Sequence, residues 1–150
     1  MDIEDQLNTI KQSLEWHRWQ SGEIILEVIE RPANLSSFEE YFSHLSLACN
    51  IKRLPSKEKF KEWTHDEAFK SIDYALQIHQ NYTHLEFPFQ DHERKELAFQ
   101  FFSLFHNPVY FTIDTELQQK KAEFDSFTIR GGTLAADEKR IGIFWIYAVY

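Results

Sequence analysis

The most apolar stretch of the chain is its C-terminal end. After Arg140, the run to Tyr150 contains no charged side chain and is rich in Ile, Phe, Trp, Tyr and Val. In a strand, Ile141 and every second residue after it would lie on one face, and the small and apolar residues between them on the other. A strand that is apolar on both faces needs a covering layer on each side. The pattern therefore predicts a buried C-terminal strand that the rest of the chain covers.

Apolar residues recur at helical spacing in four other stretches, the first of which begins at Ile3. Two of the others start with the capping-box spacing, Ser37 with Glu40 and Thr64 with Glu67. In this arrangement a hydroxyl and a carboxylate satisfy early backbone amides of the helix. The predicted helices cover residues 3 to about 14, a segment that starts at Ser37 and stops at Asn50, residues 65 to about 80, and a segment that Asp91 caps and that ends at about His106.

Two internal stretches have the composition of strands. Residues 23–30 and 109–113 are rich in β-branched and aromatic residues, and Pro32 closes the first of them. The polar residues from 115 to 121 are interpreted instead as a short helix. These assignments place most of the predicted helices before most of the predicted strands.

The end of the chain has the pattern of a hairpin. Residues 124–130 and 140–150 are predicted to pair as antiparallel strands, and Gly131 and Gly132 are assigned to the long loop between them. Helices first and strands last is an order typical of an α+β domain. We therefore expect one α+β domain over residues 1–150, with about four helices packed on a small, mainly antiparallel sheet that includes the C-terminal strand.

Composition supports a globular, soluble protein. The chain has 150 residues, of which 43% are apolar and 16% aromatic, and this is enough to form a core. Its longest apolar run is about half the length that a membrane-spanning helix requires. No basic segment followed by an apolar one opens the chain, so we expect a protein that is not exported and has no membrane partner.

Charge and cysteine content narrow the kinds of partner and of site that the protein could have. The formal net charge of -8 argues against binding to a phosphate backbone, and we expect no nucleic-acid partner and favour a basic protein. The single cysteine, Cys49, excludes an internal disulfide and a multi-cysteine zinc site, and a packing role in a reducing cytoplasm is the simpler interpretation.

The seven histidines are the first residues to consider for chemistry. No two of them have the spacing that places two imidazoles on one helical face for zinc. His79, His84 and His92 surround one predicted loop, where Glu86 or Asp91 would complete a metal site. Polar loops also collect histidines that bind nothing, so we predict no metal and no cofactor. If a metal is bound, these three histidines are the expected ligands.

Other chemical signatures are weak. No Gly-x-Ser-x-Gly elbow and no phosphate-cradling glycine loop occur in the chain. The lysines from Lys57 to Lys61 are interleaved with Phe60 and Trp63, a composition that binds single-stranded nucleic acid in some proteins. Acidic residues such as Glu58 are mixed among them, and a solvated helix face is the favoured interpretation.

An acidic, aromatic-rich domain without a catalytic constellation favours a non-enzymatic protein-binding or inhibitory module over an enzyme. One form of this class is an immunity-type protein that neutralises a basic toxin by charge-complementary docking. The residues predicted to contact the partner lie in one loop and one turn: Glu86, Phe87, Phe89, Asp91, Glu93, Asp137 and Glu138.

The alternative is a small enzyme or ligand-binding domain whose site contains the three histidines. A homodimer is compatible with either function, with the terminal strand or the aromatic helix that follows Asp91 at the interface.

Overall fold

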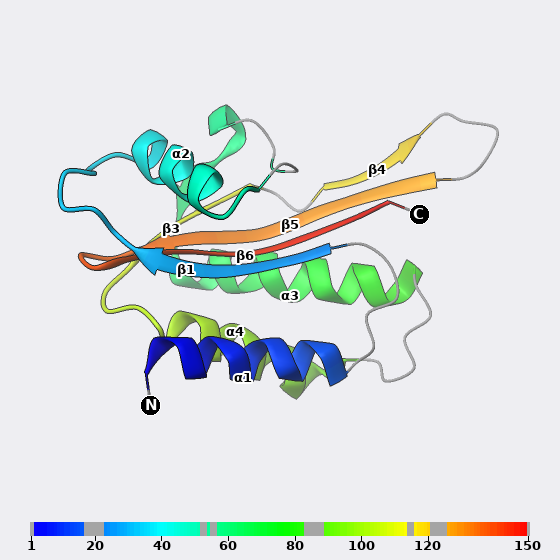
Figure 1. The fold of residues 1–150 in the computed structure, drawn as a ribbon. Coiled ribbons are helices and arrows are strands. Elements are labelled where there is room, and N and C mark those ends of the chain that lie inside the picture. The colour runs from blue at the N-terminus through cyan, green and yellow to red at the C-terminus, as the bar shows by residue number, and fades with distance from the viewer. Residues whose placement is uncertain are drawn as a thin grey trace.

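Figure 1 shows the computed structural model of the protein, which describes residues 2–16, 23–51, 54, 57–82, 89–113, 116–120 and 126–149. The helices within these ranges are α1 (Ile3–Trp16), α2 (Phe38–Ala48), the 3-10 helix η1 (Lys57–Lys59), α3 (His65–Tyr82) and α4 (Asp91–Phe102). The strands are β1 (Glu23–Glu30), β2 (Lys61–Trp63), β3 (Val109–Thr112), β4 (Glu116–Lys120), β5 (Ser126–Ala136) and β6 (Arg140–Val149).

All strand pairs are antiparallel, and the order β1-β6-β5-β3-β2 forms the sheet. Strand β4 pairs with the part of β5 that extends beyond β3. The C-terminal strand β6 has a partner on each side, with Trp145 opposite Ile25 of β1 and Gly132 of β5. The α+β fold class, with helices on an antiparallel sheet that includes the C-terminal strand, is confirmed.

Helices cover both faces of the sheet. Helix α2 lies over one face, and α1, α3 and α4 lie under the other, with α3 nearest the strands (Figure 1). Ile143 and Trp145 pack on the α2 side with Leu45, whereas Phe144 packs on the opposite side, where its ring meets that of Phe101 at 5.7 Å. The alternation predicted for the C-terminal strand is therefore confirmed, because each set of its side chains enters a separate core.

The predicted hairpin loop at the two glycines is wrong. Strand β5 continues through Gly131 and Gly132 to Ala136, and the turn to β6 lies at residues 137–139. Gly132 has φ +134, a conformation that side chains rarely allow, and a Cβ atom built on it would lie 2.0 Å from the carbonyl oxygen of Phe144. Glycine is needed here because strand β6 passes close to the backbone of β5. Close approach of another backbone is a common reason for a glycine inside a strand.

The segment predicted as a short helix, residues 115–121, contains strand β4 instead. Gln118 lies opposite Thr128 in the β4–β5 ladder, so pairing with a long neighbouring strand outweighs the polar composition. The lysines at 57–61 are exposed as expected, but they lie on η1 and on the edge strand β2 and not on a helix face.

Helix α4 begins one residue earlier than predicted and ends about four residues earlier. Its N-cap is Gln90, one residue before Asp91, and it ends at Phe102. Beyond this point the amide of Leu104 donates to the carbonyl of Phe101, a three-residue spacing that tightens the chain into a turn. Leu104 and Phe105 are buried all the same. Their apolar character therefore extended the predicted helix into a segment that is buried without being helical.

Strand β1 forms one edge of the described sheet. Lys11 of α1 makes an ion pair with Glu27 of β1, with 3.7 Å between Nζ and Oε1. Glu27 lies opposite Ile143, so its side chain points to the α2 side, while α1 lies on the other side. The side chain of Lys11 therefore passes around the outside of the edge strand.

No helix among the described residues is long and apolar enough to cross a membrane.

Candidate functional site

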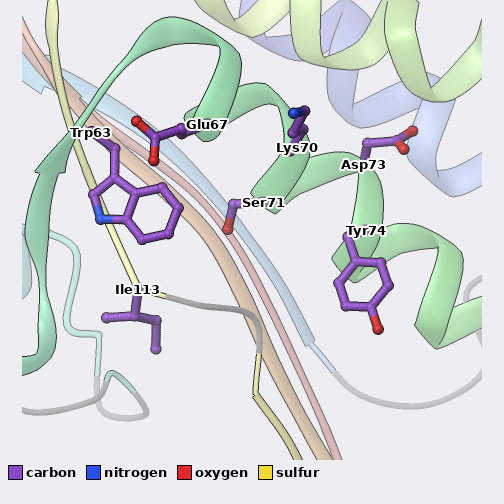
Figure 2. A pocket seen from close by; sticks show the side chains of 7 residues that line it. All are labelled: Trp63, Glu67, Lys70, Ser71, Asp73, Tyr74 and Ile113. Carbon is purple, nitrogen blue, oxygen red and sulfur yellow. The ribbon is translucent and has the colours of Figure 1, made fainter.

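A hollow of about 510 Å³ lies between helix α3 and the β2 edge of the sheet, and Figure 2 shows the side chains around it. We call it the α3–β2 hollow. Strand β2 contributes Trp63, the chain after β3 contributes Ile113, and α3 supplies the other lining residues: Glu67, Lys70, Ser71, Asp73 and Tyr74. The hollow thus combines two aromatic rings, a hydroxyl group and charged groups of both signs.

A capping box fixes the passage from β2 into α3. The backbone amide and hydroxyl of Thr64 donate to Oε1 of Glu67 at 3.3 and 3.0 Å, and the amide of Glu67 donates to the Thr64 hydroxyl at 3.2 Å. The capping box predicted from the sequence is therefore confirmed. Because Trp63 immediately precedes Thr64, these bonds fix the direction of the chain between the Trp63 wall of the hollow and the first turn of α3.

Buried hydroxyl groups form the floor. Oγ of Ser71 lies 2.9 Å from the carbonyl oxygen of Gly132 and 3.0 Å from Oγ1 of Thr112, and it accepts a hydrogen bond from the amide of Gly132 at 3.2 Å. The hydroxyl of Thr112 also donates to the carbonyl of Gly132. Ser71 is thus occupied in joining α3 to β5, which makes the floor rigid and gives this serine a structural role.

The aromatic rings occupy the two ends of the hollow (Figure 2). Trp63 is half-buried, whereas 52% of the surface of Tyr74 is exposed. Between them the carboxylate of Glu67 lies near the rim, while Asp73 pairs with the buried guanidinium of Arg94 at 2.8 Å. Such a site is suited to receive the side chains of another molecule: flat apolar contact at its ends and polar groups at its rim.

The described residues among those predicted to bind a partner lie in separate places. Glu86 and Phe87 lie outside the described residues. Phe89 is buried in the core and is not an exposed anchor. The other four lie in two pairs, one at each end of the segment from Gln90 to His106. Asp91 and Glu93 stand in the first turn of α4, and Asp137 and Glu138 stand in the turn that contacts the segment after it.

Asp91 and Glu93 have local partners. Oδ1 of Asp91 lies 2.5 Å from Nη2 of Arg94, and a carboxylate oxygen of Glu93 accepts a hydrogen bond from the amide of Gln90 at 3.1 Å. The guanidinium of Arg94 is buried and also donates to the carbonyl of Phe89 at 3.2 Å. These contacts tie the start of α4 to α3 and to the chain before it.

Asp137 holds two segments together. Its carboxylate accepts hydrogen bonds from the amides of Lys139 and Arg140 at 2.8 and 2.7 Å, and from the amide of His106 at 2.8 Å. Burial would raise the pKa of Asp137, but these three donors and the charge of Arg140 outweigh it and hold the pKa below its ordinary value. Asp137 therefore closes the β5–β6 turn and anchors the segment after α4 to it.

Replacing Asp137 with asparagine should lower the free energy of unfolding at pH 7 by about 1 to 2 kcal/mol, because an amide oxygen accepts these bonds less strongly. The pKa of Asp137 is lower in the folded protein than its unfolded value of about 3.9, so the ionised carboxylate stabilises the fold fully at pH values above about 3.9. This stabilisation is lost as the pH falls through the folded pKa. Urea unfolding from pH 7 to pH 3 should show the two proteins converging. Glu138→Gln, at the exposed neighbouring position, is the control, and a gap independent of pH would contradict the assignment.

Of the three histidines predicted as possible metal ligands, only His92 has a side chain that the structure describes. His92 is exposed on α4, His84 lies outside the described residues, and His79 belongs to α3, with its side chain outside what the structure describes. Among the described residues no three His, Cys, Asp or Glu side chains are grouped to hold a metal ion. Burial, with a smaller effect from Glu27, raises the pKa of the Cys49 thiol, which lowers its thiolate fraction and is consistent with packing.

Sequence reasoning missed Tyr74 and did not assign Trp63 to a site. For both residues the amino-acid sequence contains a signal that could have identified them. Tyr74 stands on the polar side of the predicted helix over residues 65–80, where an aromatic ring has no core to enter, and Trp63 immediately precedes a capping box. The contact between the hydroxyl groups of Ser71 and Thr112 had no such signal, because it joins segments distant in sequence.

Comparison with known proteins gives no relative for this chain: no protein-family model, no curated protein and no solved structure matches it. The functional argument therefore depends on the chain's own residues.

Proposed function

We propose that the protein is a non-enzymatic protein-binding module that docks a partner protein at the α3–β2 hollow. In its specific form the proposal is an inhibitory, immunity-type protein that neutralises a basic toxin. The setting is the cytoplasm, where a reducing environment keeps a single free cysteine as a thiol.

The observation that supports the proposal best is the exposure of Tyr74 beside Trp63. Tyrosine and tryptophan are enriched among the residues that dominate binding energy at protein interfaces. The two rings stand at the ends of one hollow, and the first turn of α3 is held by its capping box. Tyrosine and tryptophan side chains have few rotatable bonds and lose little conformational entropy when a partner covers them, so they are suited to serve as anchors.

Charge supports a basic partner. The chain has 24 acidic and 16 basic residues, and the first turn of α3 carries the acidic residues Asp66 and Glu67. Asp66 has a side chain that is 92% exposed, so its charge acts on molecules that approach. An acidic surface attracts a basic partner and accelerates association, and this effect weakens as salt screens the charges.

Affinity capture from the native source with the purified chain should isolate one basic protein, whose dissociation constant should rise with salt concentration. Replacing Tyr74 with alanine should raise that constant by about tenfold or more, because an anchor ring is lost. The free energy of unfolding of the Tyr74→Ala variant should stay within about 0.5 kcal/mol of the wild-type value, because the ring is largely exposed. Titration calorimetry with the captured partner and urea unfolding measure the two quantities.

Leu47→Ala is the matched control, since Leu47 is 84% exposed on α2, on the opposite face of the sheet. This variant should bind as the wild type does. Equal losses in the two variants would contradict docking at the hollow. A chain that captures no protein and instead retains a stoichiometric metal or small molecule would favour the enzymatic alternative.

A further inference from the structure

A second hollow lies on the other side of α3, between that helix and α4, and its volume is about 410 Å³. We call it the α3–α4 hollow. Three phenylalanine rings and four titratable side chains line it: His65, Phe69, His92, Lys95, Glu96, Phe99 and Phe102. The ring of His65 packs against Phe102 with 4.8 Å between centroids, so one wall of the hollow is an aromatic pair fixed by the fold.

Phe99 stands beside this hollow and 67% of its surface is exposed. A single exposed apolar residue is common and needs no explanation. Phe99 differs because half-buried Phe69 and buried Phe102 border the same hollow, so the apolar surface is continuous. A protruding phenyl ring next to an apolar depression is the arrangement in which two copies can exchange rings across a two-fold axis.

We propose that a second copy of this chain covers the α3–α4 hollow and that Phe99 of each copy enters the hollow of the other. The charges of the patch favour this occupant. Lys95 and Glu96 are neighbours on α4, both are exposed, and both line the hollow. A patch with one cation and one anion can place opposite charges together when it meets its own copy. A strongly basic partner would meet repulsion from Lys95 as well as attraction from Glu96.

The inference is independent of partner docking at the α3–β2 hollow, because the two hollows lie on different sides of α3. His65 and Phe69, which lie about one turn apart on α3, border the α3–α4 hollow, whereas Lys70 and Tyr74 border the α3–β2 hollow from a position about 140° further around the helix. A partner bound beside Trp63 and Tyr74 therefore leaves Phe99 available for a second copy.

Sedimentation equilibrium of the wild-type chain over a wide concentration range is the direct test, and a monomer–dimer equilibrium is expected. Phe99→Asp should abolish the dimer at every concentration at which the wild type forms one, with an unchanged thermal midpoint at concentrations low enough for the wild type to be monomeric. Two controls should leave the dimer intact: Tyr74→Asp at the other hollow and Leu47→Asp on α2. A wild type that stays monomeric, or a dimer that survives Phe99→Asp, overturns the proposal.

A charge-reversal experiment tests the two-fold contact itself. Lys95→Glu gives each copy two adjacent anions, and Glu96→Lys gives each copy two adjacent cations, so each variant alone should dimerise at least tenfold more weakly than the wild type. Mixed in equal amounts, the two variants should form a heterodimer, because the anionic patch then faces the cationic one. A mixture that associates no better than either variant places these residues outside the interface and overturns the proposal.

Discussion

Replacing Gly132 with alanine should destabilise the protein by about 3 kcal/mol or more. Two costs combine, since a side chain at an unfavourable positive φ costs about 1 to 3 kcal/mol and overfilling a packed core costs a similar amount. The added carbon would lie 2.0 Å from the carbonyl oxygen of Phe144, a backbone atom that moves only if strand β6 moves. The same residue holds the hydroxyl of Ser71, so the floor of the α3–β2 hollow would shift with it.

Urea unfolding measures the loss, with Gly142→Ala as the comparison. A Cβ atom at Gly142 would lie 2.6 Å from the tip of the Phe105 ring, and the far end of a side chain shifts at lower cost than a strand does. Gly142→Ala should therefore cost less, about 1 to 3 kcal/mol. A Gly132→Ala variant within about 1 kcal/mol of the wild type would show that the strands can separate at this point.

Replacing Trp145 with alanine should cost about 3 to 5 kcal/mol, which is a large share of the 5 to 15 kcal/mol typical of a domain. The side chain is 0% exposed, lies at the centre of the sheet, and meets the ring of Phe60 at 5.5 Å. Removal leaves a cavity between the sheet and α2 that neighbouring side chains fill only in part. Urea unfolding of the variant gives the value.

Two comparison variants separate the contribution of the buried ring volume from the effect of the indole N–H and from that of a truncation at the surface. Trp145→Phe keeps most of the apolar volume and removes an indole N–H for which no hydrogen-bond partner is found among the described residues. It should therefore cost much less than alanine. Leu47→Ala, at an exposed position on α2, should cost about 0.5 kcal/mol or less. A loss below about 1 kcal/mol for Trp145→Ala would place that side chain at the surface.

The parts of the fold that depend on local signals were predictable from the sequence. The C-terminal strand was identified because both alternating sets of side chains, such as Trp145 and Phe144, are apolar. Helices α2 and α3 were located by their capping boxes, whose residues lie close together in sequence. Such signals act over a few residues, and no distant part of the chain has to be known.

The errors came from contacts between distant segments. The glycine at 132 was assigned to a turn because its true cause, the close approach of Phe144, is invisible without the β5–β6 register. Strand β4 was interpreted as a helix because only its pairing with β5 makes a polar segment extended. The candidate site was missed for the same reason, since Trp63 and Tyr74 share one hollow only after β2 and α3 have packed.

The ion pair between Lys11 and Glu27 limits how copies of this protein can associate. An uncovered edge strand invites a strand from another molecule, and lysines at edges are a common protection against such sheet extension. Here an incoming strand would have to displace the Lys11 side chain from around β1 and break its contact with Glu27. The ion pair therefore disfavours continuous growth of the sheet through β1.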